Sequence, residues 1–221
     1  MDDPHTAPAL QIDIVSDVMC PWCIVGYRQL ERALGLTGLG ARIRWHPVEL
    51  NPGMPAEGQN LTEHMAGKYG ATPEQSAQNR TRLQALGQTL GIDFVFSPHS
   101  RIVNSFAAHQ LLDFALSIGL QHPLMLALFK AHFTDQRDVS DVTVLLDVAR
   151  SVGMVHEDAA EALASGTLAG TVREKQRFWT ARGISAVPSV IFAQRYLVTG
   201  AQGAENYAQI LRRVAREDAA A

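Results

Sequence analysis

The sequence predicts an α/β protein in which a sheet domain is interrupted by a long helical segment. Short apolar patterns typical of strands lie near both ends of the chain, at residues 11–16 and 190–192. Between them, the spacing of apolar residues is helical almost throughout residues 56–169. The chain's two cysteines, Cys20 and Cys23, directly follow the first strand pattern. We therefore expect a sheet with flanking helices, assembled from the two ends of the chain around a helical block.

Length and composition fit a single domain with a large insertion. The chain has 221 residues, of which 47% are hydrophobic, which is ample for a core. Its net charge of −3 gives no indication of nucleic-acid or acidic-membrane binding. No apolar run is long enough to span a bilayer, and the polar residues 1–8 lack the features of a secretory signal. We therefore expect a cytoplasmic protein with a loose N-terminus, a compartment in which cysteine pairs are mostly catalytic or transient.

The first strand pattern, residues 11–16, gives way to a helical pattern at the cysteine pair. The apolar residues that share one face of this helix are Ile24, Tyr27, Leu30, Ala33 and Leu34. Pro21 fits the first helical position, where no amide hydrogen is needed, so Cys20 lies at the helix N-terminus. The helix dipole and the free amides there favour the anionic thiolate of Cys20. Cys23 lies one turn inside the helix, farther from solvent, so we predict that Cys20 attacks and Cys23 resolves.

Three other interpretations of the Cys-x-x-Cys pair are open. A structural zinc site normally has four ligands, and the chain has neither a second cysteine pair nor histidines at ligand spacing. A purely structural disulfide across so short a loop constrains little of the unfolded chain. Two buried, inert thiols fit poorly with a Pro-Trp insert at a helix start. We therefore favour redox chemistry and assign no metal site.

A turn over residues 35–40 and a second strand over residues 41–50 follow the first helix. Pro47 lies within this strand pattern and indicates an edge strand or a bulge. We interpret His46 as a structural residue. Asp17, just before the cysteines, has two interpretations: a turn residue that precedes the helix, which we favour, or a proton buffer near the cysteines.

Seven helices are predicted between residues 62 and 182, each delimited by caps, prolines or glycines. Their approximate ranges are 62–69, 73–90, 105–117, 123–134, 140–150, 156–164 and 168–182. The residues assigned as caps are Thr62, Thr72, Asn104 or Ser105, and Ser140. Residues 94–96 are expected to form a short extended piece. Core packing explains the apolar positions of these helices, so we place no catalytic residue in the helical block.

Strand patterns return near the C-terminal end of the chain. Residues 190–192 and 196–198 flank a predicted hairpin turn at residues 193–195. These strands would add to the sheet that the N-terminal strands begin. A final helix is predicted over residues 204–216, followed by a frayed tail over residues 217–221.

A proline marks the start of this second strand region. Pro188 heads a β-branched run, where a proline cannot donate a ladder hydrogen bond, and the Val187–Pro188 peptide can be cis. Here the chain resembles the thioredoxin superfamily, and within it the FrnE-like proteins of the DsbA-type branch. The stretches that carry the resemblance are Asp17–Cys23, Glu49–Pro52 with Gly58, Asn104 with Ala108–His109, Gly183–Pro188 and Gly200–Gln202. The first and fourth stretches are specific, and the others are suggestive.

The resemblance implies a thioredoxin-like fold, a central mixed β-sheet with flanking helices, that carries a large all-helical insertion domain. The sheet domain would comprise residues 1–55 and 167–221, and the insertion would comprise residues 56–166. In the family, the active-site disulfide faces a cis-proline whose backbone pairs with the substrate. Val187 and Pro188 take that role by their match to the motif.

The resemblance also implies a protein-disulfide oxidoreductase or isomerase that acts on protein or small-molecule thiols and disulfides and needs no bound cofactor. Pro21 and Trp22 would contact the substrate, where Trp22 either offers an apolar docking face or packs against the helical block. Pro-Trp replaces the Pro-His of many periplasmic DsbA proteins, so their oxidising strength does not carry over. Ser185–Ala186 and Val48 depart from the small-Gly pair and the Phe that are common in the family.

Two other functions are weighed against disulfide exchange. Kappa-class glutathione transferases and 2-hydroxychromene-2-carboxylate isomerases resemble this chain in the Val-Pro region and the helical insertion, but they usually carry serine where Cys20 stands. Glutathione would then be a co-substrate, with its carboxylate near the start of the last helix at Gln202 and Gly203. A non-enzymatic chaperone or adaptor would instead grip unfolded chains through the helical block and Trp22. The intact cysteine pair favours disulfide exchange over both.

Overall fold

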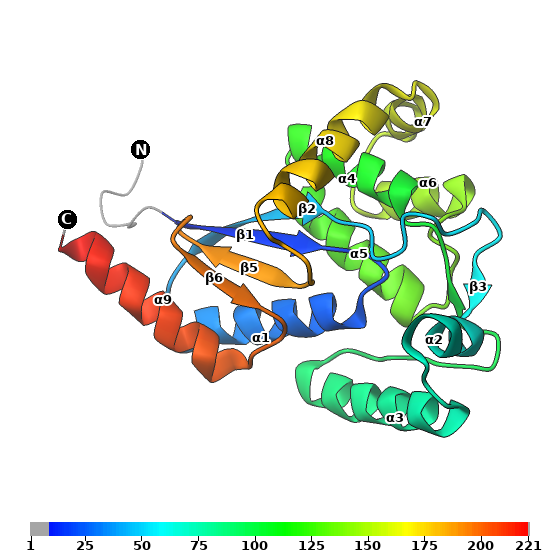
Figure 1. Ribbon diagram of the computed structural model, residues 1–221. Helices are drawn as coiled ribbons and strands as arrows, with labels where there is room; N and C mark the ends of the chain where they lie inside the picture. Colours follow the sequence, from blue (N-terminus) through cyan, green and yellow to red (C-terminus); the bar gives the residue numbers. More distant parts are fainter. Residues whose placement is uncertain (1–8, 221) are drawn as a thin grey trace.

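A four-stranded mixed sheet forms the centre of the molecule (Figure 1). The computed structural model describes residues 9–220, so the expected loose N-terminus over residues 1–8 lies outside the described residues, as does residue 221. The strands of the sheet are β1 (Leu10–Ser16), β2 (Ala41–Pro47), β5 (Ser189–Phe192) and β6 (Tyr196–Thr199). Their order is β2-β1-β5-β6, with β1 parallel to β2 and antiparallel to β5. The two ends of the chain therefore build one sheet, which confirms the prediction.

Helices cover both faces of this sheet and fill the chain between its two halves. Their bounds are α1 (Pro21–Thr37), α2 (Leu61–Tyr69), α3 (Pro73–Leu90), α4 (Phe106–Ser117), α5 (Gln121–Phe133), α6 (Val142–Ser151), α7 (His156–Ala164), α8 (Thr167–Ala181) and α9 (Ala204–Ala219). On one side of the sheet α1 and α9 pack side by side, whereas α5 and α8 contact β2 (Figure 1). Helices α2 and α3 lie at the lower right of that view, beyond the N-terminal end of α1. The predicted division into two domains stays a prediction.

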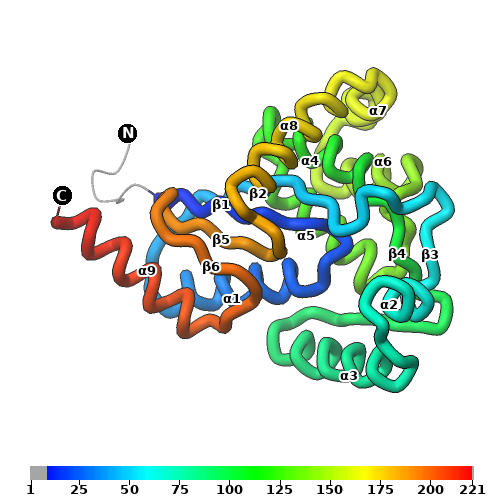
Figure 2. The backbone as a smooth tube through the Cα atoms, in the orientation of Figure 1, coloured from blue at the N-terminus to red at the C-terminus, as the bar shows by residue number. Residues whose placement is uncertain are grey.

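A second, two-stranded sheet ties α2 to the rest of the molecule. Its strands are β3 (Gln59–Asn60) and β4 (Arg101–Ile102), which are antiparallel and pair Gln59 with Ile102. They lie side by side in Figure 2 although the whole of α2 and α3 separates them in the chain. No residue of α2 is buried; it contacts α3, β3 and β4, and its Lys68 donates to the Leu50 carbonyl and the Asn51 side chain. The predicted extended piece at residues 94–96 forms no strand; Phe94 is buried there against Phe133.

Helix α1 presents its apolar face to the core and continues past its predicted end. Pro21 occupies the first turn after the N-cap Cys20, as predicted. The helix ends where Gly38 adopts a left-handed backbone (φ 68°), a conformation that costs glycine little. The turn was predicted to begin at residue 35, which is wrong, because Gly35 lies within the helix, on its exposed side.

Two predicted helix starts shift by one or two residues because a neighbouring side chain provides the cap. The capping box of Thr72 and Gln75 at the start of α3 is confirmed. The cap of α2 is Asn60, whose side chain accepts the Thr62 amide, and not Thr62 itself. Likewise, α6 is capped by Asp141 instead of Ser140. Helix α5 begins at Gln121, before the proline that was predicted to start it.

The strand and tail predictions need two corrections. Strand β2 ends at Pro47 on the sheet edge, so residues 48–50 are a loop and the edge assignment is confirmed. The hairpin of β5 and β6 is confirmed. Helix α9 continues to Ala219, three residues past its predicted end, because Tyr196 and Arg213 both hydrogen-bond to Glu217 in the tail that was expected to fray.

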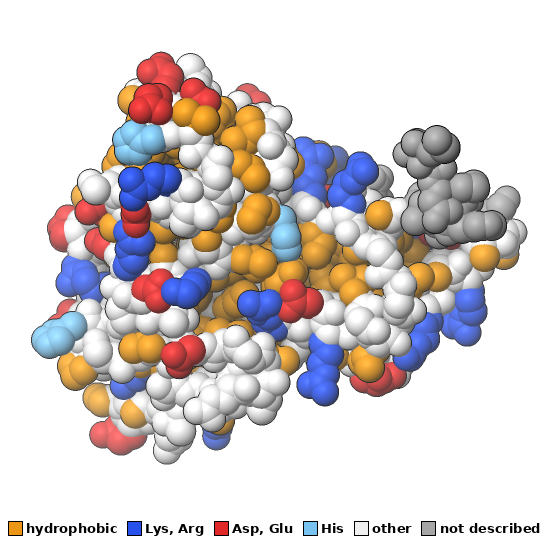
Figure 3. Space-filling model, turned by 180° about the vertical axis from the view of Figure 1, so that it is seen from behind, with side chains coloured by type: hydrophobic (Ala, Val, Ile, Leu, Met, Phe, Trp, Pro, Cys, Tyr) orange, Lys and Arg blue, Asp and Glu red, His pale blue; other side chains and the backbone are white. Residues whose placement is uncertain are grey.

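The surface is mixed in charge. Figure 3 shows that acidic and basic side chains are interspersed over the described part of the rear face, while hydrophobic side chains gather towards its middle. Among residues 9–220, no helix is both long and apolar enough to cross a membrane.

Two glycine substitutions test the packing around α3 and the corrected end of α1. A Cβ added at Gly87 of α3 would lie 2.6 Å from the Ile92 carbonyl oxygen and 2.6 Å from Phe94 Cδ2. We expect Gly87→Ala to destabilise the protein by about 1–3 kcal/mol through overpacking. Gly35→Ala, which meets nothing within 4 Å, should stabilise it by about 0.5–1 kcal/mol because the helix interior disfavours glycine.

Urea unfolding of both variants measures these differences. Equal and small effects would contradict the close approach of the residue 92–94 loop to α3. A destabilised Gly35→Ala variant would contradict the helical assignment of residue 35.

Candidate active site

The two cysteines lie together at the N-terminus of α1. Cys20 is the N-cap residue, its amide donates to the Asp17 carbonyl at 3.0 Å, and its carbonyl accepts the Cys23 amide at 3.0 Å. The two cysteines lie 3.6 Å apart and both are free thiols. Cys23 is fully buried, whereas Cys20 keeps 4% exposure and lines a cavity. The geometry therefore allows a disulfide to close, with Cys20 as the sulfur that an incoming group meets first.

Burial sets the protonation state of Cys23. Burial raises the pKa of the Cys23 thiol well above its ordinary value, and the adjacent Cys20 raises it further, while the hydroxyl of Ser16 offsets only part of the rise. Near neutral pH the resting group at residue 23 is accordingly a neutral thiol. An anionic nucleophile in the reduced site therefore has to come from Cys20.

The loop before β5 folds back onto Cys20. The Val187–Pro188 peptide is cis, and the Cys20 Sγ lies 3.8 Å from the Val187 carbonyl oxygen. The Pro188 carbonyl accepts the Gly200 amide at 2.7 Å, which fixes the loop to the start of the C-terminal segment. Gly26 of α1 faces the same proline, because a Cβ there would lie 3.0 Å from Pro188 Cγ. The structure thus brings together residues that stand 167 positions apart in the chain.

Asp17 ties the cysteine turn to two other segments. Its fully buried carboxylate accepts the Met19 amide at 3.1 Å and the Leu50 amide at 2.6 Å. His109 Nε2 of α4 lies 3.4 Å from Asp17 Oδ1 and makes no hydrogen bond among the described residues. Burial raises the pKa of Asp17, but the neighbouring His109 and the two amides outweigh it, so the net pKa is lowered. Asp17 is a turn residue, as favoured, whose contact with His109 was not predicted.

His46 belongs to a second buried pair of a histidine and a carboxylate, which lies away from the cysteines. Its Nε2 is 2.7 Å from Asp13 Oδ1, and its ring packs 4.7 Å from the Trp179 ring, measured between centroids. These contacts join β1, β2 and α8. They agree with the interpretation of His46 as a structural residue.

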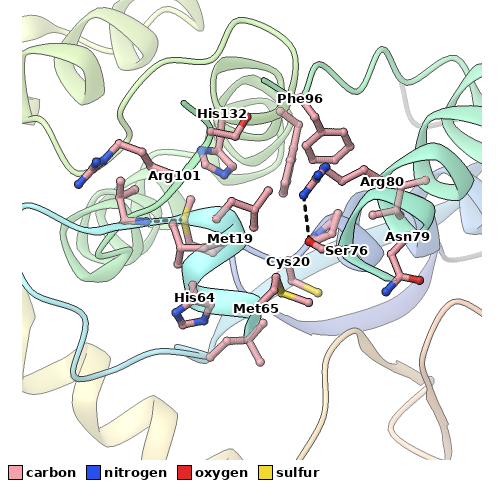
Figure 4. A pocket seen from close by; sticks show the side chains of 18 of the residues that line it. Met19, Cys20, His64, Met65, Ser76, Asn79, Arg80, Phe96, Arg101 and His132 are labelled. Atoms are coloured by element: carbon pink, nitrogen blue, oxygen red, sulfur yellow. Dashed lines mark hydrogen bonds between the residues drawn. The ribbon is translucent and has the colours of Figure 1, made fainter. Parts of the chain in front are cut away.

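A cavity of about 520 Å³ opens beside Cys20, between the start of α1 and the helical block (Figure 4). Met19, Cys20, Pro21 and Trp22 form one wall. The opposite walls come from α2, α3, the segment around β4 and the C-terminal end of α5. The apolar side chains on these opposite walls include Leu61, Met65, Leu83, Phe96, Ile102, Val103 and Phe133.

Sequence reasoning placed no site residue in these helices, yet they supply most of the cavity wall. Arg80 of α3 and His132 of α5 are labelled in Figure 4 and both line the cavity. Burial lowers the pKa of His132 to about 4, so its imidazole is neutral near neutral pH. The missed signal is a polar or charged residue that interrupts an otherwise apolar helix face, as His132 does one turn after Leu128 and Phe129.

Of the remaining predicted site residues, two line the cavity and two do not. Pro21 and Trp22 line the cavity, and Trp22 is 46% exposed, so its ring both faces solvent and contributes to the wall. Gln202 and Gly203 are not among the lining residues; the Gly203 amide donates to the Gln29 side chain at 2.8 Å, and Gln202 donates to the Thr199 carbonyl at 2.8 Å. A carboxylate contact at Gln202 and Gly203 stays a prediction, as do the roles of the other site residues.

Within residues 9–220, no group of three or more His, Cys, Asp or Glu side chains is arranged to hold a metal ion. The cysteine pair is the cluster with evident chemistry beside the cavity. This arrangement can support nucleophilic attack by one sulfur on a disulfide, followed by attack of the second sulfur on the first.

Comparisons with known proteins agree with this geometry. The model of a family described as the DSBA-like thioredoxin domain matches residues 11–212. The crystal structure of a probable DsbA oxidoreductase from Streptomyces coelicolor superposes with a TM-score of 0.86 at 29% identity, covering 92% of this chain and 89% of that one. An uncharacterized protein of Bacillus subtilis, YwbO, is 25% identical over 198 residues, which are 88% of this chain and 92% of the relative.

More distant structures share the fold. A 2-hydroxychromene-2-carboxylate isomerase has a TM-score of 0.70 at 15% identity, covering 95% of this chain and 98% of that one. The cytosolic disulfide reductase DsbM of Pseudomonas aeruginosa, solved with GSH, has a TM-score of 0.62 at 17% identity, covering 94% and 100%.

Removing the charge of Asp17 tests its hold on the cysteine turn. We expect Asp17→Asn to lose about 2–4 kcal/mol of stability near neutral pH, because the new amide group faces backbone donors and a buried partner is lost. The wild-type advantage should be present above the unfolded-state pKa of about 3.9 and should disappear as the pH falls through the lower folded-state pKa.

Urea unfolding as a function of pH measures this difference. Asp135→Asn is the matched control, because Asp135 forms an exposed pair with Lys130 at 2.6 Å, and its loss should cost less than about 1 kcal/mol. A difference between wild type and Asp17→Asn that did not shrink in acid would show that the carboxylate charge is not what holds the turn.

Proposed function

This chain belongs to the DSBA-like thioredoxin domain family, a family of thiol oxidoreductases, and from that premise we propose that it exchanges disulfides through Cys20 and Cys23. One observation carries the proposal. A thiol at a helix N-terminus faces a cavity, beside a cis-proline loop, with a second thiol buried behind it. Each thiol then has a separate task.

In the first step the Cys20 thiolate attacks one sulfur of a substrate disulfide. The substrate S–S bond breaks, a mixed disulfide forms between Cys20 and the attacked sulfur, and the other substrate sulfur leaves as a thiolate. The position of Cys20 at the start of α1 supports this role, because the helix dipole favours an anion there. Cys23 does not compete for the substrate, because it is fully buried and held as a thiol.

In the second step Cys23 releases the product. Its thiol loses a proton to solvent, and the sulfur attacks Cys20 Sγ, which forms the Cys20–Cys23 disulfide and frees the second substrate sulfur as a thiolate. The substrate has then gained two electrons, and the enzyme has lost them. The same steps in reverse oxidise a substrate dithiol, and the direction follows the relative reduction potentials of enzyme, substrate and compartment.

The loop at Val187 and Pro188 would hold the substrate. The Val187 carbonyl lies beside Cys20 Sγ, so a substrate main chain that brings its sulfur to Cys20 passes along this loop. The exposed ring of Trp22 extends the contact on the other side of Cys20. These positions support the roles assigned by the motif match.

A cytoplasmic location and membership in the FrnE-like subgroup are part of the proposal. The fold is shared with a cytosolic disulfide reductase that was solved with GSH, which favours a thiol of low molecular weight, glutathione included, as recycling partner. It is also shared with a 2-hydroxychromene-2-carboxylate isomerase. That likeness keeps a glutathione-dependent isomerase or transferase as the second candidate.

Serine substitutions of the two cysteines test the proposal. We expect Cys23→Ser, supplied with a small disulfide, to accumulate one mixed disulfide on Cys20 and to stall, with turnover reduced by at least about 100-fold, because no second sulfur resolves the adduct. Cys20→Ser should form no adduct, because Cys23 is buried and protonated. Intact-protein mass spectrometry under non-reducing conditions counts the adducts.

Two outcomes would contradict this scheme. Full turnover by Cys23→Ser would favour the isomerase or transferase, which needs one nucleophile only. Suppression of aggregation that survives replacement of both cysteines by alanine, with no disulfide exchange in the wild type, would favour the chaperone or adaptor.

A further inference from the structure

The cavity beside Cys20 carries ionisable groups of mainly one sign. Arginines at four positions and an aspartate at one line it, and the rest of its wall is largely apolar. Two of these arginines already have partners: Arg137 forms an ion pair with Asp147 at 2.8 Å, and Arg101 donates to the carbonyl of Glu57. Three of these arginines have no carboxylate partner among residues 9–220: Arg80, Arg82 and Arg101, of which Arg101 is bound to a backbone carbonyl.

Arg80 is the arginine best placed to meet a ligand. It is half-buried on α3, and its Nη1 donates to Ser76 Oγ at 2.9 Å and to Thr62 Oγ1 at 3.4 Å. Ser76 itself is buried, so this contact fixes the guanidinium against the wall of the cavity. In Figure 4 the Arg80 side chain extends from α3 into the cavity, next to Phe96 and into the same space as Cys20. Arg82 is exposed at the edge.

The wall between Arg80 and Cys20 suits an apolar body. Met19 and Met65 approach from opposite walls, and Phe96 and Leu83 complete the surface. Thioethers adapt to irregular shapes and make favourable contacts with aromatic rings. The volume of about 520 Å³ lies within the range of about 300–1,000 Å³ that is usual for small-molecule sites.

We propose that the cavity binds a small aromatic or similarly apolar acid that carries the reacting sulfur, with its carboxylate on Arg80 and its sulfur at Cys20. This inference rests on the proposed function and names the substrate class. The guanidinium provides two parallel donors, which match the two oxygens of a carboxylate. The apolar body excludes water from the ion pair and so strengthens it.

The chemistry is the exchange already described, with an aryl or alkyl disulfide as the oxidant. The Cys20 thiolate attacks the sulfur that lies nearest to it, and the other half of the substrate leaves as a carboxylate-bearing thiolate. Cys23 then gives up its proton to solvent and displaces the bound half, so one disulfide yields two thiolates, one proton and the Cys20–Cys23 disulfide. Arg80 touches the carboxylate and no reacting atom, so it is a specificity-determining residue.

A pair of matched disulfides tests the proposal. The first is 4,4′-dithiobis(benzoate), and the second is the corresponding bis(benzamide), which has the same shape without the charge. The measurement is the second-order rate of aryl thiolate release by the reduced wild-type protein near neutral pH. 2-Mercaptoethanol, a thiol without a carboxylate, gives the intrinsic ratio of the two rates, and we expect the protein to favour the acid beyond that ratio by about 10- to 100-fold.

Substitutions assign the preference to one side chain. Arg80→Gln should remove the preference for the acid and leave the amide rate within about two-fold, because only the charge-assisted contact is lost. Arg80→Lys should restore part of the preference, because it keeps the charge but not the planar pair of donors. Arg177→Gln is the matched control: it makes the same charge change at an exposed residue of α8 outside the cavity.

The outcomes separate this inference from the proposed function. The substrate assignment is refuted if wild type reacts with both disulfides at Cys20 but shows no excess preference for the acid. It is also refuted if Arg80→Gln slows the reactions of both disulfides equally. In either case the proposed disulfide exchange is unaffected. Equal preference in Arg80→Gln and Arg177→Gln would also overturn the substrate assignment. If neither disulfide modifies Cys20 in wild type, the proposed function itself is refuted. Should Arg80→Gln fail to fold, the wild-type ratio measured against 2-mercaptoethanol and the Arg80→Lys variant decide.

Discussion

The buried carboxylate of Asp17 is the constraint on which the site depends. It joins the turn before Cys20 to the loop at Leu50 and to α4 through His109, so three distant segments are fixed around one charge. Because a charge inside the protein must be matched by donors, a change in any of these segments is felt by the others. The sheet places α1, and this carboxylate then sets where α1 begins relative to the helical block.

The predictable part of the fold was local. The capping box at Thr72, the hairpin after Phe192 and the proline at the start of α1 each depend on a few neighbouring residues. The two wrong caps were also local errors: Asn60 lies two residues before the assigned Thr62, Asp141 lies one residue after the assigned Ser140, and each accepts the free amides in its place. The two-residue strands β3 and β4 are too short to produce any alternation in the sequence.

The residues of the site that could be predicted are those that belong to short sequence motifs. Cys20 and Cys23 are recognised by spacing, and Pro188 by the unsuitability of proline inside a strand. The cavity wall was not predictable, because Arg80 and His132 lie on helices whose apolar positions were assigned to the hydrophobic core. Only the tertiary structure shows that the inner faces of these helices surround an unfilled space next to a thiol. At the start of α9 the Gly203 amide donates to the Gln29 side chain, a contact between distant segments that no local pattern indicates.

Helix α2 contributes a wall to this space although none of its side chains is buried. Lifting it away would break the short β3–β4 pairing, its contacts with α3, and the exposed hydrogen bonds of Lys68 to the Leu50 carbonyl and the Asn51 side chain. The free energy of such a local opening is small compared with that of global unfolding. Admission of reactants and departure of products can thus proceed through a fluctuation of one short helix, while the sheet and the sulfur pair keep their geometry throughout the catalytic cycle.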